Sequence, residues 1–285
     1  MSVAFPRTYT ESWSDYTLLD AGGGKKLERF GRIVTIRPEV QAYFQSKMPF
    51  SEWNKLAHVE FTQKGTKNGS WKKIRPETPD SWTIQFEKLT FQLELTKFKH
   101  IGIFPEQVEN WRFIKNNIKT GEKFLNLFAY TGAASLVAKS CGADVTHVDS
   151  VKQLVNWSKN NMELSNLNDI RWVLDDALKF AQREVKRGNK YQGIIMDPPA
   201  FGLGTKKEKW ILEQQLPLLL ETTAKLLEPT GFLILNTYSP KVDKQLISRL
   251  AHKYFPKKDI SVSELWMNTK QENDLYFGDL LRVSS

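Results

Sequence analysis

Apolar segments alternate with amphipathic segments throughout the second half of the chain. Five short apolar segments predict buried strands, at residues 123–130, 144–149, 170–176, 191–199 and 232–239. The segments between and after them have helical periodicity, at 134–142, 150–167, 177–188, 212–231 and 241–255. This alternation predicts a doubly wound α/β fold with a mostly parallel sheet. Two last strand segments, 260–269 and 274–284, have no helix between them and predict an antiparallel edge.

The chain before residue 99 has a different pattern. Residues 81–95 alternate between apolar and polar side chains on both sides of Glu87-Lys88. Residues 58–63 and 70–75 flank a glycine-containing turn and predict a hairpin. We therefore predict a small β-rich domain over 1–98 and a second domain over 99–285, which begins with a connecting helix near 107–119.

Composition excludes several classes of protein. Hydrophobic residues make up 40% of the 285 residues and charged residues 26%, a balance that can bury a core. The sequence contains no segment apolar enough for a membrane helix and no apolar signal-peptide core, so we expect a cytoplasmic protein. A single cysteine, Cys141, excludes intrachain disulfides, and the four scattered histidines predict no metal site. No signal indicates the oligomeric state.

The net charge of +9 favours contact with nucleic acid. Residues 61–75 contain five basic side chains, two glycines and Trp71, but no acid. A basic hairpin tip exposed to solvent is one interpretation, and an RNA-binding surface with an aromatic side chain for base stacking is the other. The predicted RNA-binding residues are Lys64, Lys67, Trp71, Lys72, Lys73 and Arg75, together with Lys206 and Lys207 farther along the chain.

Acidic residues end two successive predicted strands, at the edge where doubly wound sheets bind their ligands. The first strand leads into Tyr130-Thr131-Gly132, the second ends at Asp149, and the third ends at Asp175-Asp176. The first turn lacks the G-x-G-x-x-G pattern, which argues against a dinucleotide. Asp149 could bind ribose hydroxyls and Asp176 an adenine amine, or each could cap the helix that follows, a role that Ser150 could also fill. Together the acids predict an adenosine-binding groove.

The fourth strand ends in Asp197-Pro198-Pro199-Ala200-Phe201. Prolines fix the backbone, so we expect the carbonyls beside them to face a bound ligand. The carboxylate of Asp197 could hold a nucleobase or an amine, and Phe201 offers a stacking plane. A rigid turn without function is the alternative interpretation.

The segments FLNLFAYTGAAS, HVDS, WSKNN, VLDDA and MDPPAF resemble the class I S-adenosylmethionine-dependent methyltransferases, which have a Rossmann-like sheet. More closely, they resemble the bacterial 23S ribosomal-RNA methyltransferase group with an N-L-F-x-Y-T-G first motif and a D-P-P-x-F fourth motif. The resemblance covers about residues 85–240, including FKHIGIFPEQVENW before the first motif. It implies S-adenosylmethionine as cofactor and ribosomal RNA as substrate.

The resemblance also implies a role for individual residues. Phe128, Tyr130 and Thr131 would surround the methionine part of the cofactor, Asp149 and Ser150 would hold the ribose, and Asp176 and Ala177 would border the adenine. Phe104 and Gln107 would close the pocket, with Asn110 a further candidate, and Asn161 would be structural. The acceptor would lie against the expected catalytic residues Asp197, Pro198 and Phe201.

A missing thiol bears on the acceptor atom. Relatives that methylate C5 of cytosine use a cysteine nucleophile after the fifth strand, and this chain has Tyr238 near that position. A nitrogen acceptor is therefore favoured. The contiguous Asp-Pro-Pro-aromatic pattern of amino-group methylases is not met, because Ala200 precedes Phe201, so the acceptor atom stays open. A protein side chain or a small molecule as acceptor, or a non-catalytic RNA-binding protein, are the alternatives.

Overall fold

The computed structural model describes residues 5–64, 68–203 and 209–285, and its contacts divide the chain into two compact units. The larger unit contains the residues up to Thr8, Glu109–Leu265 and Gly278–Ser285. The N-terminal unit contains Tyr9–Val108 and Trp266–Phe277. The boundary after Val108 falls later than the expected one at residue 98. The segment Trp266–Phe277 adds C-terminal residues to the N-terminal unit, which a simple two-part division of the sequence does not anticipate.

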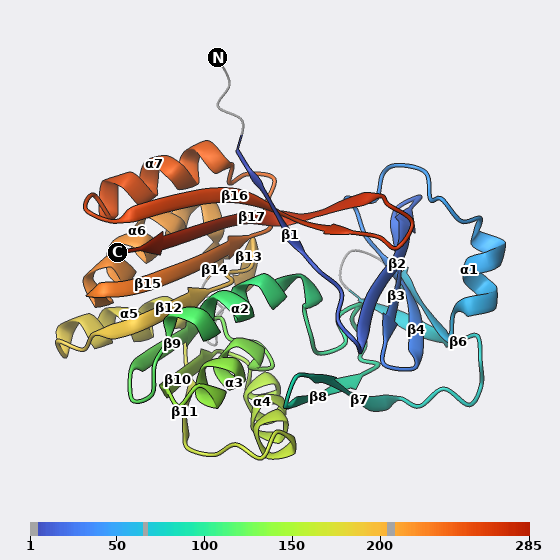
Figure 1. The fold of residues 1–285 in the computed structure, drawn as a ribbon, viewed down its shortest axis with the longest axis horizontal. Helices are drawn as coiled ribbons and strands as arrows, with labels where there is room; N and C mark the ends of the chain where they lie inside the picture. The colour runs from blue at the N-terminus through green and yellow to red at the C-terminus, as the bar shows by residue number, and fades with distance from the viewer. Residues whose placement is uncertain (1–4, 65–67, 204–208) are drawn as a thin grey trace. The chain divides into compact units, whose positions relative to one another are not determined.

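An eight-stranded sheet forms the centre of the larger unit, with strand order β1-β16-β17-β15-β12-β9-β10-β11 (Figure 1). Neighbouring strands from β15 to β11 pair in parallel, and β17 pairs antiparallel with β15. The fold class predicted from the sequence is confirmed. The strands span Arg7–Thr10 (β1), Lys123–Leu127 (β9), Asp144–Asp149 (β10), Ile170–Leu174 (β11), Tyr191–Met196 (β12), Leu227–Thr237 (β15), Asp259–Asn268 (β16) and Asp274–Ser284 (β17).

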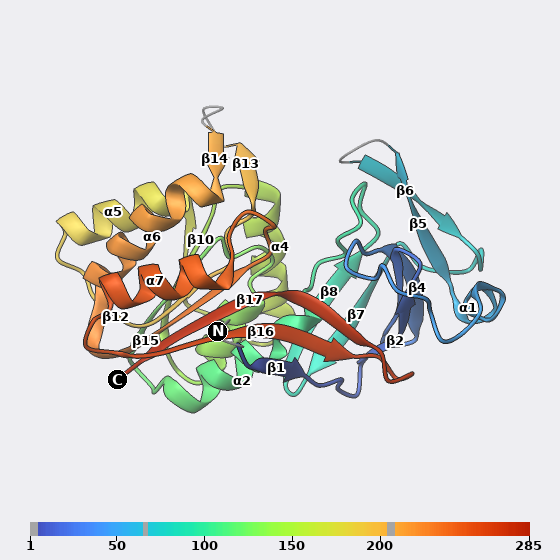
Figure 2. The ribbon, with the colours of Figure 1, turned by 90° about the horizontal axis from the view of Figure 1, so that it is seen from above.

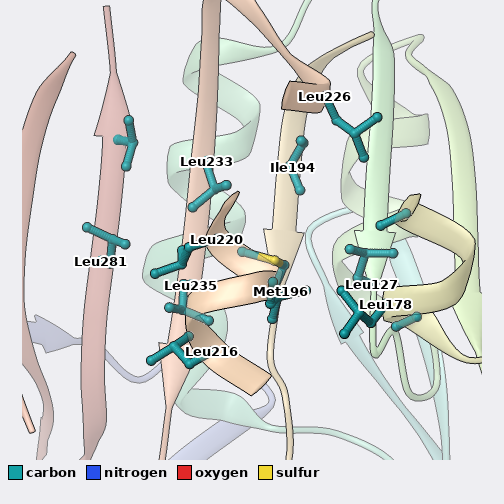
Figure 3. Close-up of a cluster of buried hydrophobic side chains, with 14 of the residues drawn as sticks. Leu127, Leu178, Ile194, Met196, Leu216, Leu220, Leu226, Leu233, Leu235 and Leu281 are labelled. Atoms are coloured by element: carbon teal, nitrogen blue, oxygen red, sulfur yellow. The ribbon is translucent and has the colours of Figure 1, made fainter. Parts of the chain in front are cut away.

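Helices cover both faces of this sheet. One face packs against α5 (Ala177–Lys186), α6 (Leu212–Leu226) and α7 (Lys244–Tyr254), whose apolar side chains share a core with alternate residues of β9, β12 and β15. Leu127, Met196 and Leu235 belong to this core (Figure 3). The helices α2 (Val108–Asn117), α3 (Ala133–Ser140) and α4 (Lys152–Leu164) complete the larger unit. The helix expected over 212–231 ends earlier because the chain enters β15 at Leu227.

The N-terminal unit is β-rich, as the sequence predicts. Its main sheet has the strand order β2-β3-β4-β5-β6, and β7 and β8 form a separate hairpin. The β5–β6 hairpin lies at the edge of the main sheet (Figure 2). The elements span Tyr16–Gly22 (β2), Lys25–Phe30 (β3), Ile33–Pro38 (β4), Phe50–Leu56 (α1), Val59–Lys64 (β5), Asn68–Lys73 (β6), Ser81–Phe86 (β7), Leu89–Glu94 (β8) and the 3₁₀ helix Pro105–Gln107 (η1).

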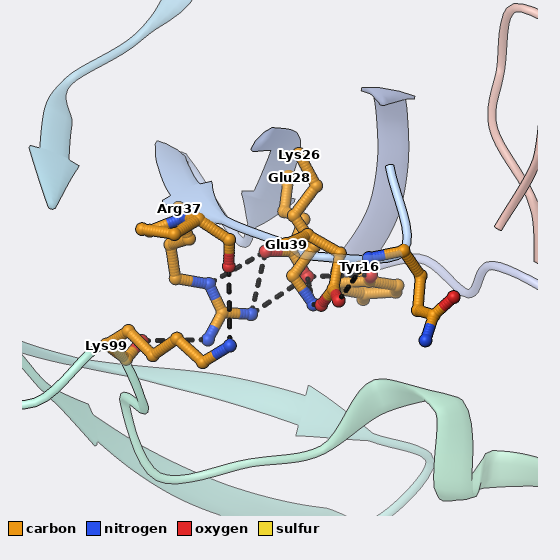
Figure 4. A network of polar contacts seen from close by, with 8 residues as sticks. Tyr16, Lys26, Glu28, Arg37, Glu39 and Lys99 are labelled. Carbon is orange, nitrogen blue, oxygen red and sulfur yellow. Dashed lines mark hydrogen bonds and ion pairs between the residues drawn. The ribbon is translucent and has the colours of Figure 1, made fainter. Parts of the chain in front are cut away.

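A network of buried charges crosses the sheet of the N-terminal unit (Figure 4). Arg37 donates two hydrogen bonds to Glu28, at 2.7 and 2.9 Å, and Tyr16 donates a third to it at 3.0 Å. Lys26 lies 3.5 Å from carboxylate oxygens of both Glu28 and Glu39. Burial alone would raise the pKa of Glu28, but the charges of Arg37 and Lys26 hold it below its ordinary value.

This network also fixes the segment that leads to η1. Arg37 donates a hydrogen bond to the carbonyl of Lys99 at 3.0 Å, and Lys99 Nζ lies 3.4 Å from the carbonyl of Pro38. Thr10 donates to the carbonyl of Glu106 at 2.6 Å. The segment that carries Phe104 and Gln107 is therefore held on the sheet by buried polar contacts.

Candidate active site

The turn after β9 has an unusual backbone. Phe128 and Tyr130 have φ values of 57° and 52°, and Gly132 has a φ of 87°. Side chains other than glycine rarely adopt this left-handed region, and such residues concentrate at functional sites. Gly132 begins α3, and a Cβ at this position would lie 3.0 Å from the Cβ of Ser158. The segment 128–132, called the β9 turn below, is therefore a strained backbone that its surroundings must hold.

Asp149 holds the β9 turn from the end of the neighbouring strand β10. Its Oδ2 accepts a hydrogen bond from the amide of Tyr130 at 2.9 Å, and its Oδ1 accepts one from the amide of Val151 at 2.9 Å. The side chain is 9% exposed, and burial raises the pKa of this carboxyl although the backbone hydrogen bonds oppose the shift. Each carboxylate oxygen can accept a second hydrogen bond, and a donor from a ligand would stabilise the buried charge.

The expected cap at Ser150 is wrong. The N-cap residue of α4 is Val151, which makes no side-chain cap hydrogen bond. The amide of Val151 instead donates to the carboxylate of Asp149, two residues before it. Ser150 lies between them and is half-buried.

The end of β11 combines acids with exposed apolar side chains. Asp176 is the N-cap of α5 and accepts the amide of Lys179 at 2.9 Å, so its capping role is real. Asp175 forms an ion pair with Arg183, and Ala177 is buried. Leu174 is the register partner of Asp149 and is 51% exposed, while Val151 is 42% exposed. Sequence reasoning did not single out Leu174 or Val151, whose exposed apolar side chains could contact a planar ring beside Asp149.

A chain of buried neutral groups lies beneath the β9 turn. Asn126 donates to the hydroxyl of Ser135 at 2.9 Å, which lies 3.0 Å from Nδ1 of His147. The hydroxyl of Ser158 lies 3.4 Å from Nε2 of the same histidine and donates to the carbonyl of Tyr130 at 2.9 Å. Burial lowers the pKa of His147 to about 3, so its ring is neutral at pH 7. This group, called the His147 chain below, supports the strained turn without a charge.

Asn161 makes a similar contact with the β9 turn. It is fully buried on α4 and donates to the carbonyl of Thr131 at 3.0 Å. Thr131 itself is 1% exposed. The contact agrees with the structural role expected for Asn161.

The segment after β12 folds back onto the start of α6. Pro198 is buried, Asp197 is half-buried, and Phe201 is 49% exposed at the start of the short strand β13 (Phe201–Leu203), which pairs with β14 (Lys209–Ile211). The indole of Trp210 donates to the carbonyl of Pro199 at 2.8 Å and packs against Phe128, with ring centroids 4.9 Å apart. The amide of Leu212 donates a hydrogen bond to the carbonyl of Ala200 at 3.1 Å.

These two contacts correct one expectation. Of the carbonyls beside the two prolines, those of Pro199 and Ala200 accept hydrogen bonds within the protein. Their hydrogen bonds instead fix the position of Asp197 and Phe201, because they tie the turn to Trp210 and to α6.

Phe104 and Gln107 belong to the N-terminal unit. Phe104 is half-buried and its ring centroid lies 5.2 Å from that of His100. Gln107 is buried at the end of η1. Burial and nearby cations lower the pKa of His100 to about 3.

The residues predicted to bind RNA differ in their surroundings. Trp71 donates to the carbonyl of Thr96 at 2.8 Å and packs against Phe61, while Arg75 donates to the carbonyl of Lys55 at 2.8 Å, so both stabilise the N-terminal unit. Lys73 lies 2.8 Å from Asp80 in an ion pair. Lys64 and Lys72 are exposed on the β5–β6 hairpin. Lys67, Lys206 and Lys207 lie outside the described residues.

The described parts of the chain contain neither a cluster of metal ligands nor a membrane-spanning helix. Within residues 5–64, 68–203 and 209–285, no group of three or more His, Cys, Asp and Glu side chains is arranged to hold a metal ion. In the same ranges, no helix is both long enough and apolar enough to cross a membrane.

Comparisons with solved structures show the same architecture elsewhere. An S-adenosylmethionine-dependent methyltransferase from Agrobacterium tumefaciens superposes with a TM-score of 0.92, is 33% identical, and is matched over 100% of this chain and 94% of its own. A tRNA m1G37 methyltransferase from Methanocaldococcus jannaschii, 12% identical, shares the fold with a TM-score of 0.57 over 95% of this chain and 74% of its own.

Curated relatives are similar over part of their length. A protein named ribosomal RNA large subunit methyltransferase K/L from Pseudoalteromonas translucida is 33% identical over 51% of this chain and 21% of its own. One named ribosomal RNA large subunit methyltransferase K from Neisseria meningitidis is 30% identical over 64% of this chain and 51% of its own. The chain thus spans about half or less of these relatives.

The family comparison covers the β5–β6 hairpin, the β9 turn and the strand ends around Asp149 and Asp197. A model of the S-adenosylmethionine-dependent methyltransferase family matches residues 54–261, well over half of the chain. The protein therefore belongs to the S-adenosylmethionine-dependent methyltransferase family.

Proposed function

We propose that this protein transfers a methyl group from S-adenosylmethionine to a nitrogen of a base in ribosomal RNA. The observation that carries the proposal is the similarity of its methyltransferase region to proteins named ribosomal RNA large subunit methyltransferases. The absence of a cysteine near the end of β15 favours nitrogen over C5 of cytosine, because that carbon needs a thiol nucleophile.

The residues at the strand ends fit the adenosine part of the cofactor. Asp149 would accept hydrogen bonds from the ribose hydroxyls, which would add to its backbone donors and further stabilise the charge of a buried carboxyl with a raised pKa. Leu174 and Val151 would contact the two sides of the adenine, and Asp176 and Ala177 would border its edge. Ser150 stays a candidate for the ribose.

The β9 turn would lie against the methionine part. Phe128, Tyr130 and Thr131 follow β9 directly, and the left-handed backbone at Phe128 and Tyr130 sets the direction of their side chains. Phe104 and Gln107 are proposed to complete cofactor binding, because they lie in the segment that resembles the one preceding the first motif of the family.

The chemistry requires alignment more than activation. When bound, the cofactor supplies a methyl group on a positively charged sulfur, which is already reactive toward a lone pair. Asp197 would orient the acceptor nitrogen, and Phe201 would stack on the base. The lowered pKa of His147 keeps its ring neutral under the turn, so it adds no repulsion to a nearby cation.

The N-terminal unit is proposed to hold the RNA backbone. Lys64 and Lys72 are the exposed cations of the β5–β6 hairpin that this proposal uses. Each phosphate contact that is lost lowers the salt dependence of binding, by about 0.7 in the slope of log K against log salt for a single strand.

The test uses the full-length protein and ribosomal RNA from a strain in which its gene is deleted. Wild type should transfer labelled methyl groups from S-adenosylmethionine to this RNA, and the Lys64→Ala/Lys72→Ala variant should bind the RNA more weakly, with a smaller salt slope. An Arg112→Ala variant, which alters an ion pair with Glu109 at 2.6 Å, serves as the matched control. Robust transfer to a protein or a metabolite with none to RNA would reject the RNA proposal and favour those alternatives.

A further inference from the structure

The end of strand β15 lies beside Asp197. The registered pairs between β12 and β15 are Ile195 with Ile234 and Met196 with Leu235. Asp197 directly follows β12, and Asn236 is the next residue of β15, a neighbouring strand about 4.8 Å away. Asn236 therefore belongs to the same edge of the sheet as the expected acceptor site.

Strand alternation directs Asn236 away from the apolar core, and the same direction is expected for Asp197, which directly follows β12. Met196 and Leu235 point into the apolar core formed with α6 (Figure 3). Successive side chains of a strand alternate between faces, so the residue after each is expected to point the opposite way. On that opposite face, Asn126 of β9 bonds to Ser135 beneath the β9 turn.

The side chain of Asn236 carries an unused hydrogen-bond acceptor. The residue is 3% exposed, and its Oδ1 is buried with no hydrogen-bond partner among the residues that the structure describes. Buried polar atoms in folded proteins are nearly always paired, because an unpaired one costs free energy that a ligand donor would recover. An unpaired carbonyl oxygen beside Asp197 indicates a missing donor.

We propose that Asn236 binds the acceptor together with Asp197, and that the acceptor is the exocyclic amino group of adenine, guanine or cytosine. This inference rests on the proposed function. Two oxygen acceptors on adjacent strands match a group with two N–H hydrogens, one for each. Phe201 and Tyr238, which follow the same two strands, are 49% and 39% exposed and provide stacking surfaces for an extruded base.

The two hydrogen bonds would orient the amino nitrogen for transfer. With both hydrogens held, the nitrogen lone pair points away from Asp197 and Asn236, toward the methyl carbon. The lone pair forms the new N–C bond while the electron pair of the S–C bond leaves with sulfur, which becomes a neutral thioether. The nitrogen, now positively charged, loses one proton to the carboxylate of Asp197 and becomes a neutral methylamino group.

The experiment compares Asn236→Leu, which keeps the volume but removes the amide, and Asn236→Ala with Thr237→Val. Thr237 is the matched control because its hydroxyl is also buried without a described partner but points to the opposite face. Both Asn236 variants should lower kcat/KM for ribosomal RNA from the deletion strain about 10- to 100-fold. Calorimetric affinity for S-adenosylmethionine should stay within about 2-fold of wild type, as should kcat/KM of Thr237→Val.

Mass spectrometry of the nucleosides then identifies the methylated atom. A product methylated on an exocyclic amino group, with the losses above, supports the inference. Methylation at a ring nitrogen, or full RNA turnover by both Asn236 variants, would overturn it and leave the proposed function standing. Methylation at a carbon would overturn both. Binding of S-adenosylmethionine by wild type without methylation of any RNA would overturn both.

Discussion

The two units of this protein bury polar groups in opposite ways. The N-terminal unit buries charges, with Glu28 and Arg37 only 0% and 4% exposed and bonded directly to each other. The larger unit buries neutral groups, and the His147 chain passes hydrogen bonds from Asn126 to the carbonyl of Tyr130. The buried charges fix the segment from Lys99 to Gln107, and the neutral His147 chain supports the strained β9 turn.

The difference follows from whether a charged ligand is expected next to each network. A buried ion pair is stable only when both partners are present and fully hydrogen-bonded. It therefore suits a position where no ligand enters or leaves. The β9 turn is proposed to lie against the positively charged part of the cofactor, and a protonated histidine beneath it would repel that charge. The lowered pKa of His147 avoids this cost.

The largest effect is expected in the N-terminal unit. Glu28→Ala leaves Arg37 and Lys26 buried without their shared carboxylate and should destabilise this unit by about 3–5 kcal/mol. Hydrogen exchange measured by mass spectrometry over residues 25–38 reports this unit separately from the larger one.

A double substitution sharpens the first prediction. Glu28→Leu/Arg37→Met removes both charges and keeps their volume, so it should recover most of the loss, because removing a whole buried pair is often neutral. If the single variant is as stable as wild type, the network is not what holds the segment from Lys99 to Gln107.

The next effect tests the β9 turn. Gly132→Ala places a Cβ 3.0 Å from the Cβ of Ser158 at a φ of 87° and should cost about 2–3 kcal/mol. Gly121→Ala is the matched control, since Gly121 has a φ of 79° but an added Cβ meets no described heavy atom within 4 Å, so only about 1 kcal/mol is expected. Thermal unfolding gives the stability difference, and calorimetry should show weaker binding of S-adenosylmethionine by Gly132→Ala. Equal effects of the two variants would mean that contact with Ser158 is unimportant.

The third prediction concerns acid stability. The pKa of His147 is lowered from 6.5 to about 3 in the folded protein, so below pH 6.5 the unfolded chain binds a proton that the native protein does not. Stability is therefore full above pH 6.5 and falls toward pH 3, by about 1.4 kcal/mol per pH unit, or about 2 kcal/mol between pH 6.5 and 5.

His147→Gln should remove this part of the acid sensitivity from the larger unit. His100 has a pKa of about 3 for the same main cause, burial, so His100→Gln should do the same for the N-terminal unit. Hydrogen exchange at pH 7 and pH 5 over residues 144–149 and 89–101 separates the two. An unchanged pH dependence in His147→Gln would show that His147 is not held neutral.

Much of the fold and part of the site follow from the sequence. Strand and helix periodicity predicts the parallel sheet, and the positions of Asp149 and Asp197 at strand ends predict where the site lies. The His147 chain does not follow, because its members are separated along the chain and meet only when β9, β10, α3 and α4 pack together. The exposure of Leu174 and Val151 is likewise a property of packing.

Surface roles are the least predictable from composition. Trp71 and Arg75 have the residue types of an RNA-binding surface, but the structure uses the indole and the guanidinium for hydrogen bonds within the N-terminal unit. Strands β13 and β14 are only three residues long, too short for an alternation of apolar and polar residues to be recognised. The helix α1 has only seven residues and no side-chain cap at its N-terminus, so the sequence carries little signal for it.

The smallest effect is expected for an exposed ion pair in the same unit as the buried network. Lys55 lies 2.7 Å from Glu52 on α1, and the two side chains are 70% and 48% exposed. Water and salt screen such a pair, and holding two long side chains together costs entropy, so Lys55→Ala should change stability by only about 0.2–0.5 kcal/mol. The same hydrogen-exchange measurement, applied to residues 50–56 and 25–38, compares this substitution directly with Glu28→Ala. A loss from Lys55→Ala close to that from Glu28→Ala would show that burial is not what makes the charges of the N-terminal unit important.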